Sequence, residues 1–236
     1  MREQFVTALK KIADPSAGPK VARYFHADPN ARSSGNRVLG VSPGRVFPVA
    51  KQFAAMSLAD VERLLESPFY EVRLGAVSIM DFQARAKKTT SEQRKELFDL
   101  YIRRHDRINN WDLVDRAAPH VVGRYLADRP RGPLYKLAKS RNPWERRTAI
   151  VSTWYFIREN DVEDTFQIGA LLVRDPHELV QMAVGSWLRE AGKRDEKRLL
   201  QFLKLHATSM PRVMLRYAVD KLPVAVRQKF LTRDAQ

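Results

Sequence analysis

The stretch "SRNPWERRTAI" (140–150) decides the fold, because its outline recurs along the chain. A polar residue precedes a proline, and the helical pattern that follows contains a small residue next to an aliphatic one. Proline is favoured at the first position of a helix, and a preceding Ser, Asn or Asp caps that helix. The same pattern occurs in "ESPFYEVRLGAV" (66–77) and "VRDPHELVQMAV" (173–184), and "SMPRVMLRYAV" (209–219) follows it except that Met210 precedes the proline.

The spacing of these prolines is typical of helix-pair repeats. Pro143, Pro176 and Pro211 lie 33 and 35 residues apart, and Pro68 precedes Pro143 by 75 residues, or about two such periods. The pattern predicts Ser67, Asn142 and Asp175 as N-caps. Each repeat also carries a small and aliphatic pair that lets neighbouring helices approach closely: Ala76–Val77, Ala149–Ile150, Ala183–Val184 and Ala218–Val219.

Amphipathic segments precede these helices and complete the pairs. Their apolar residues recur every three or four positions, as on one face of a helix, at 57–66, 90–104, 133–140 and 162–173. We therefore expect an all-α protein, a right-handed superhelical solenoid of HEAT-like antiparallel helix pairs. One domain would span 1–236, with less regular N-terminal helices in 1–56 and HEAT-like repeats in 57–236.

Composition favours a polyanionic partner. Lys and Arg number 42 against 27 Asp and Glu, a net charge of +15, which predicts long-range attraction to nucleic acid or, second, to an anionic membrane surface. No apolar run is long enough to span a membrane and the N-terminus lacks a signal peptide, so we expect a cytoplasmic protein. Without cysteine, and with five histidines that lack metal-ligand spacing, the chain predicts no metal and no cofactor.

The stretch "NNWDLVDRAAPH" (109–120) carries the candidate chemistry. Trp111 and Asp115 are four residues apart on an expected helix, so both side chains project from one face and can touch one ligand. Asp112 lies in the first turn, where an acidic side chain caps the helix and meets its dipole. For Asp115 the alternative is an ordinary salt bridge to Arg103, Arg104 or Arg116.

A second candidate face follows in "NPWERRTAIVSTWYFIR" (142–158). Trp144, Arg147 and Trp154 lie at offsets of three and seven, again on one helical face. Tryptophans at this spacing usually belong to the core. An arginine at the rim of a basic groove, however, binds phosphate in a forked geometry, and this is the role we expect for Arg147.

Together these residues resemble the AlkD-type DNA alkylation repair glycosylases, which are HEAT-like solenoids. The resemblance implies that Asp115 is the catalytic carboxylate, with Trp111 beside it, and that Arg147 binds DNA next to the lesion. Tyr24, Arg45 and Trp187 are weaker DNA-binding candidates. The similar stretches are "VARYF" (21–25), "VLGVSPGR" (38–45), "NNWDLVD" (109–115), "WERRTAI" (144–150) and "GSWLRE" (185–190).

The chain departs from the family pattern at one position. A second family tryptophan, which packs on the sugar, would fall on Ser186, whereas the chain has Trp187 one residue later. One residue rotates a side chain by about 100° around a helix. Trp187 therefore does not simply replace the missing ring.

With this resemblance, the sequence predicts a glycosylase that hydrolyses the N-glycosidic bond of N3- or N7-alkylated purines in duplex DNA. The resemblance also implies that it acts without a deep base-flipping pocket. One carboxylate suffices when the leaving base already carries positive charge, whereas ordinary glycoside hydrolysis needs two. The alternative is a non-catalytic HEAT-like DNA-binding protein or protein-interaction scaffold. The expected partner is double-stranded DNA containing alkylated bases; we expect a monomer with no membrane contact and no obligate protein partner.

Overall fold

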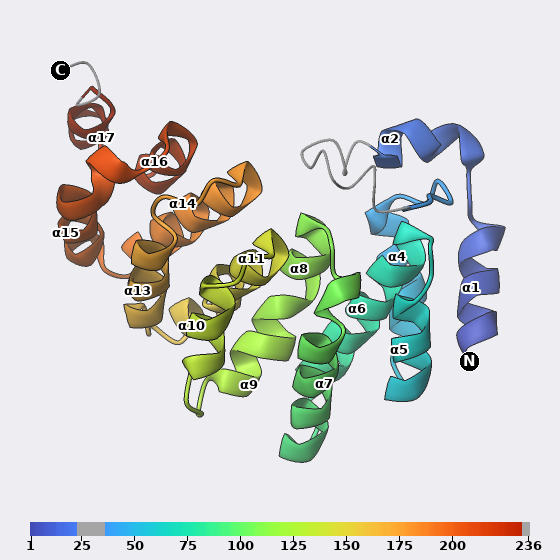
Figure 1. The fold of residues 1–236 in the computed structure, drawn as a ribbon. Helices are drawn as coiled ribbons and strands as arrows, with labels where there is room; N and C mark the ends of the chain where they lie inside the picture. The colour runs from blue at the N-terminus through green and yellow to red at the C-terminus, as the bar shows by residue number, and fades with distance from the viewer. Residues whose placement is uncertain (23–35, 233–236) are drawn as a thin grey trace. The chain divides into compact units, whose positions relative to one another are not determined.

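Helices make up the regular secondary structure of the computed structural model, which describes residues 1–22 and 36–232 (Figure 1). Within these residues no strand forms, and Arg37 and Phe69 make an isolated bridge. The predicted all-α fold class of helix pairs is confirmed. The chain divides into two compact units, Met1–Tyr125 and Leu126–Gln236. That both act as one domain stays a prediction.

The first unit contains the N-terminal helices and the first helix pairs. Its helices and helical turns are α1 (Arg2–Lys11), η1 (Pro15–Ala17), α2 (Gly18–Ala22), α4 (Pro43–Gln52), α5 (Leu58–Leu65), α6 (Tyr70–Arg85), α7 (Ser91–Arg103), η3 (His105–Arg107), α8 (Trp111–Ala118) and η4 (Pro119–Gly123). The short helix α9 (Arg124–Leu126) spans the boundary between the units.

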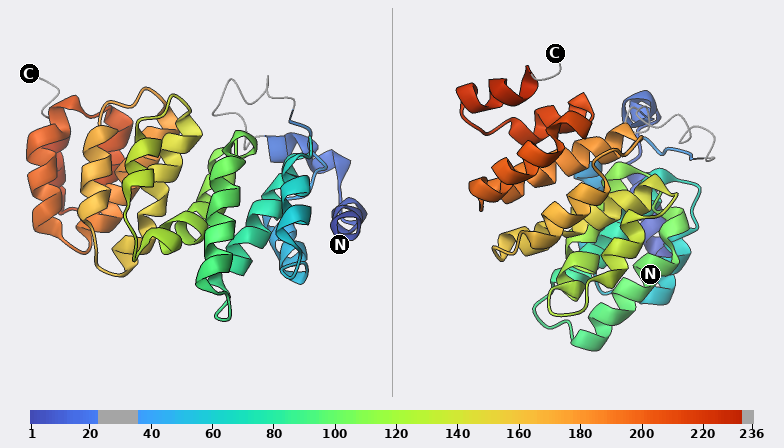
Figure 2. Two further views of the ribbon diagram at one scale, coloured as in Figure 1. Left: turned by 60° about the horizontal axis from the view of Figure 1, so that its bottom comes forward. Right: turned by 60° about the vertical axis from the view of Figure 1, so that its left-hand side comes forward.

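The second unit continues with helix pairs, seen from two further directions in Figure 2. Its elements are α10 (Gly132–Ala138), α11 (Pro143–Ser152), α12 (Trp154–Arg158), α13 (Glu163–Leu171), α14 (Glu178–Gly192), α15 (Glu196–His206), η5 (Ala207–Ser209), α16 (Arg212–Val219) and α17 (Val224–Leu231).

The repeated small and aliphatic pairs lie in the core of both units, as the spacing predicts. All eight residues are at most 2% exposed. Asn142 caps α11 by accepting from the backbone N–H of Trp144 at 2.9 Å. Ser67 and Asp175 instead bind the N–H two residues on, at 3.1 and 2.9 Å, in turns that precede helices beginning at Tyr70 and Glu178. These two were wrong as N-caps, because the chain makes a turn before each helix starts.

Helix α6 forms the centre of the first unit. It packs against α4, α5 and α8, and every residue from Tyr70 to Asp81 is buried. Three of these buried residues are charged: Glu71, Arg73 and Asp81. A buried charge is costly unless it is paired, so each of them constrains what packs around α6.

Helix α14 holds the same central place in the second unit, between α11 and α16. Gly185 allows the approach to α16, because a Cβ there would lie 2.4 Å from the carbonyl oxygen of Met214 and 2.6 Å from Cβ of Tyr217. Those atoms belong to backbone and the base of a side chain, which cannot swing aside. The rotation of α14 about its own axis is thereby fixed.

Replacing Gly185 with alanine tests this packing. We expect Gly185→Ala to destabilise the protein by about 1–3 kcal/mol, because overpacking must push two helices apart. Gly132→Ala is the matched control, since a Cβ at Gly132 meets nothing within 4 Å. Urea denaturation followed by circular dichroism measures both, and equal stability of the two variants would contradict close packing of α14 on α16.

Candidate active site

Trp111 and Asp115 line one cleft of about 300 Å³ within the first unit. Trp111 is the first residue of α8, Asp115 lies one turn later, and both side chains are half-buried. The remaining wall comes from α4, α6 and α8: Pro43, Phe47, Leu74, Asp112 and Arg116. The structure therefore brings the predicted aromatic and carboxylate together, while their catalytic role stays a prediction.

The start of α8 is fixed by its own polar residues. Asn110 occupies the N-cap position in an extended conformation and is fully buried. Its side-chain amide donates to the Oδ1 of Asp112 at 2.8 Å. Asp112 thus has a positioning contact in the first turn, which agrees with its expected place at the head of the helix.

Arg73 ties the start of α8 to the segments before α4 and α6. Its guanidinium donates to the Ser67 carbonyl at 2.8 Å, to Oδ1 of Asn109 at 3.2 Å and to Oδ1 of Asn36. Burial, reinforced by the like charge of Arg107, lowers the pKa of Arg73 to about 10. The group still carries its charge at neutral pH, so these hydrogen bonds are charge-assisted.

Glu71 fixes the segment that leads into α4. Its fully buried carboxylate accepts the backbone N–H groups of Leu39 at 2.9 Å, Gly40 at 2.8 Å and Val41 at 3.2 Å. Gly40 has φ +86°, and a Cβ there would lie 1.9 Å from the carbonyl oxygen of Asp14. Only glycine fits this left-handed, crowded position. The first turn of α4, which forms part of the cleft, is held from this side.

Arg116 forms the charged wall of the cleft. Its guanidinium carbon lies 4.7 Å from the ring centre of Phe47 and 4.8 Å from that of Phe82. Nη2 is 3.0 Å from Oδ2 of Asp81, and Nε donates to Oγ of Ser78 at 3.1 Å. Burial lowers the pKa of Arg116, and the charge of Asp81 opposes that shift. Arginine suits this place because it can stack and form an ion pair at once.

Asp81 is the counter-ion of this wall, and its side chain is 1% exposed. Arg85 approaches it at 3.5 Å and the Nδ1 of His120 at 3.1 Å. Arg116 is therefore ion-paired with Asp81 on α6.

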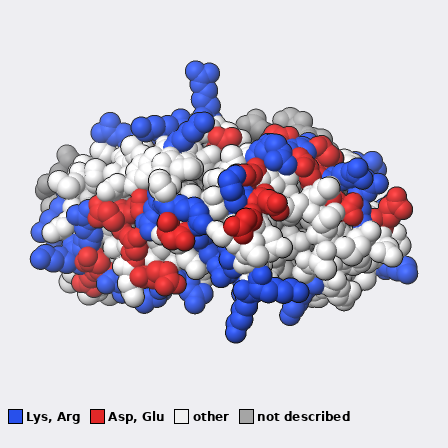
Figure 3. Space-filling view, turned by 90° about the horizontal axis from the view of Figure 1, so that it is seen from below, with Lys and Arg blue, Asp and Glu red and all other residues white. Residues whose placement is uncertain are grey.

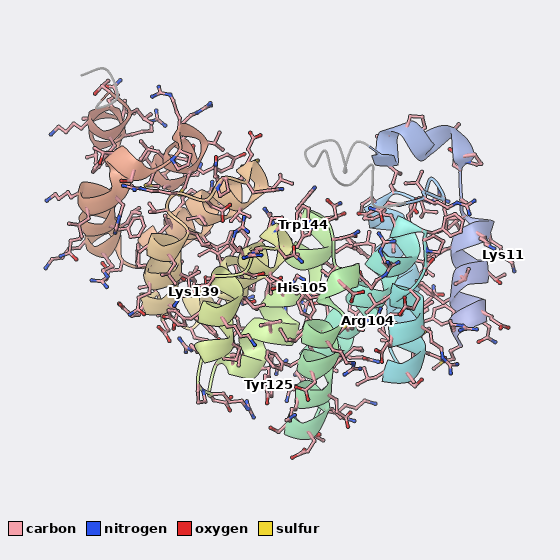
Figure 4. The ribbon with its side chains drawn as sticks, in the orientation of Figure 1. Lys11, Arg104, His105, Tyr125, Lys139 and Trp144 are labelled. Atoms are coloured by element: carbon pink, nitrogen blue, oxygen red, sulfur yellow. The ribbon has the colours of Figure 1, made fainter. Side chains whose placement is uncertain are left out.

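The other two arginines considered as partners of Asp115 also bind different carboxylates. Arg103 contacts Glu62 at 2.9 Å, and Arg104, labelled in Figure 4, contacts Glu66 at 2.5 Å. Both of these carboxylates come from α5 or its end. These pairs tie α7 to α5, away from the helix that carries Trp111.

Arg147 lies in the second unit and is buried rather than at a rim. Its side chain is 5% exposed, and Nη1 donates to the carbonyl of Leu179. Trp144, labelled in Figure 4, is 6% exposed and meets His177 edge-on, with ring centres 5.4 Å apart. Trp154 is half-buried. The expected rim position of Arg147 is wrong, because helical spacing selects a face and α14 covers that face.

The remaining candidates are placed as follows. Trp187 is half-buried, and its Nε1 donates to the carbonyl of Val151 at 3.0 Å, which joins α14 to α11. Arg45 is exposed at the start of α4. Hydrogen bonds from Ser16 lower the pKa of the Asp14 carboxyl, and the charge of Arg45 acts in the same direction. Tyr24 lies outside the described residues.

Surface charge is more mixed than the net charge indicates. On the face seen in Figure 3, acidic side chains lie next to Lys and Arg. Among the basic residues expected near the groove, Arg146 binds Asp175 with both Nε and Nη2, at 2.6 and 3.0 Å. Lys136, Lys139 and Arg141 are exposed. Part of the positive charge therefore holds the fold together.

Sequence reasoning missed Phe47, the position of Arg116 in the cleft wall and the buried charges of α6. The available signal was the position of Glu71, Arg73 and Asp81 inside an otherwise apolar helix. Charged residues are rarely buried fully unless they are paired, so such residues mark buried partners. Apart from Ser67 and Arg85, their partners lie 30 to 39 residues away in the chain and carry no local pattern.

Comparisons with known proteins agree with this fold. The family model described as DNA alkylation repair enzyme matches residues 5–222, and the chain belongs to that family. A solved structure described as a predicted DNA alkylation repair enzyme from Enterococcus faecalis has 14% sequence identity and a TM-score of 0.68. The match covers 90% of this chain and 97% of that one, and it shows a shared fold.

Two further findings concern similarity to curated proteins and membrane-spanning helices. Comparison with curated proteins gives no match. Among the described residues, none of the helices combines the length and apolar character that crossing a bilayer requires.

The ion pair behind the cleft can be tested with two arginines that share one carboxylate. We expect Arg116→Gln to destabilise the protein by about 3–5 kcal/mol, because the buried carboxylate of Asp81 then loses its nearest positively charged partner. Arg85→Gln is the control: its side chain is 52% exposed and lies farther from Asp81, so we expect less than about 1 kcal/mol. Urea unfolding measures both losses, and a larger loss for Arg85→Gln would reverse the assignment.

Proposed function

We propose that the protein is a DNA glycosylase that releases cationic N3- or N7-alkylated purines from duplex DNA. The observation that carries the proposal is the cleft shared by Trp111 and Asp115 in a member of the DNA alkylation repair enzyme family. The net charge of +15 supports attraction to the DNA backbone.

The charges around the cleft support a cationic substrate. Two carboxylates line it, Asp112 and Asp115, against the single guanidinium of Arg116. That guanidinium is paired with Asp81 outside the lining. A locally acidic cleft in a strongly basic protein suits a ligand whose backbone is anionic and whose damaged base is positive.

Asp115 is the proposed catalytic carboxylate. Rupture of the N-glycosidic bond leaves its electron pair on the departing base, which becomes neutral, and builds positive charge at C1′. Asp115 would stabilise that charge electrostatically, and water would add its oxygen to C1′ and release a proton to the solvent. Asp112 instead lies in the first turn of α8, where its Oδ1 accepts from Asn110 and helps to hold the start of the helix. No acid is needed for a base that leaves as a neutral molecule.

Trp111 is the proposed sugar platform. An indole face attracts an electron-poor group, so it would favour the sugar as positive charge develops. Tyr24 and Arg45 remain proposed DNA-binding residues. For Arg147 and Trp187 we propose an indirect role through α11 and α14, since each donates a hydrogen bond to backbone within its unit.

The catalytic proposal is tested on methylated duplex DNA. We expect Asp115→Asn to lower the rate of 7-methylguanine or 3-methyladenine release by at least about 100-fold, because removal of an electrostatic catalytic group costs that much. DNA affinity should stay within about threefold, and Asp112→Asn should keep most of the activity. Released bases are quantified by chromatography. An inactive wild-type protein would refute the glycosylase proposal.

A non-catalytic DNA-binding protein or protein scaffold is the second candidate. It is favoured by the internal hydrogen bonds of Arg147 and Trp187, two of the residues expected at DNA.

Salt dependence separates a DNA-binding protein from a scaffold. We expect affinity for duplex DNA to fall by at least about tenfold between 50 and 200 mM salt, because bound phosphates release counterions. Fluorescence anisotropy with a labelled duplex measures this. Weak binding that does not change with salt would favour the scaffold, whereas tight binding without base release would leave a DNA-binding protein.

A further inference from the structure

An aromatic-floored groove lies between α13 and α15 in the second unit. Its volume is about 440 Å³. Phe166 and Phe202 form the floor with ring centres 5.8 Å apart, and they are 3% and 6% exposed. Ala170 and Leu205 add aliphatic surface to the lining. The groove contains none of the residues proposed for glycosylase chemistry.

Exposed apolar side chains extend this surface. Leu205 lines the groove and is 76% exposed, the largest exposed fraction of any large hydrophobic residue that the structure describes. Leu171, which follows Ala170 in the chain, is 47% exposed. Scattered exposed leucines are ordinary, but apolar residues gathered at a groove with a polar rim are typical of interaction sites.

The polar rim is basic. Arg198, Lys204 and His206 line the groove together with Gln167 and Gln201. Glu163 neutralises Arg198 through two contacts of 2.9 Å, whereas Lys204 is exposed and makes no ion pair with any residue the structure describes.

The outer face of α15 repeats this combination of charge and apolar surface. Lys197, Gln201, Lys204 and Leu205 stand at offsets of four, seven and eight, so they share one face, and all four are exposed. An apolar anchor flanked by carboxylates would complement that face. A nucleic acid backbone would not use the aromatic floor or the leucine.

We propose that this groove binds an acidic amphipathic helix of a partner protein. One or two apolar side chains of that helix enter over Phe166 and Phe202, next to Leu205, and Asp or Glu residues face Lys204 and Lys197. In this binding mode the apolar face of a helix lies in a hydrophobic groove, and charged residues at the rim of the groove select the partner. This proposed binding site for a partner helix is additional to any DNA-binding surface of the protein.

The experiment selects helical peptides displayed on phage for binding to the purified full-length protein. We expect enriched peptides to carry apolar residues at offsets of three, four and seven with flanking Asp or Glu. An enriched peptide should bind Leu205→Asp at least about tenfold more weakly, because one central apolar anchor contributes that much. Val224→Asp is the control, since Val224 is 58% exposed on α17 and receives the same charge change.

Three outcomes would overturn the proposal. The first is a selection that enriches no sequence, or only sequences without the acidic amphipathic pattern. Equal weakening by Val224→Asp would show a general charge effect. Displacement of the bound peptide by an unmodified DNA duplex, with Leu205→Asp also weakening DNA affinity, would identify the groove as a nucleic-acid surface. Because these readouts use binding of a peptide, their failure is independent of whether the protein releases alkylated bases.

Discussion

The buried charges of α6 are the constraint on which the first unit depends. Transfer of a charge to the interior costs several kcal/mol unless a partner meets it there. Glu71 accepts hydrogen bonds from three backbone N–H groups before α4. Arg73 donates to a backbone carbonyl before α6 and to a side chain before α8. Asp81 forms an ion pair with Arg116 of α8. Each pairing fixes the segment that supplies the partner. The shape of the cleft beside Trp111 therefore depends on the buried charges of α6 and their partners as well as on the residues that line the cleft.

Long-range attraction and the local charge of the cleft come from different residues. The excess of basic residues acts over long range on a polyanion, whereas the cleft itself presents two carboxylates and one compensated guanidinium. Asp81 is essential to that balance, because an uncompensated Arg116 would repel a cationic base next to Asp115. In the proposed enzyme, a buried aspartate with no access to substrate would thus influence which leaving groups are accepted.

Much of the fold was predictable from sequence, since proline spacing and the small and aliphatic pairs are local patterns that packing must respect. The shared face of Trp111 and Asp115 followed from helix geometry alone. The same reasoning failed for Arg147, because periodicity defines a face without saying whether solvent or another helix covers it. Glu71 could not be matched with its backbone partners, nor Asp81 with Arg116, for a related reason: contacts across 30 residues or more leave no periodic trace in the sequence.

The displaced tryptophan of α14 limits how the proposed chemistry can work. Gly185 holds α14 against α16, so the helix cannot rotate by about 100° to carry the ring of Trp187 to the direction of Ser186. The indole N–H is also used at the carbonyl of Val151. With no second ring at Ser186, stabilisation of the sugar would fall mainly on Trp111 and Asp115. Such a site depends more heavily on the positive charge of the leaving base, which favours cationic lesions over neutral ones.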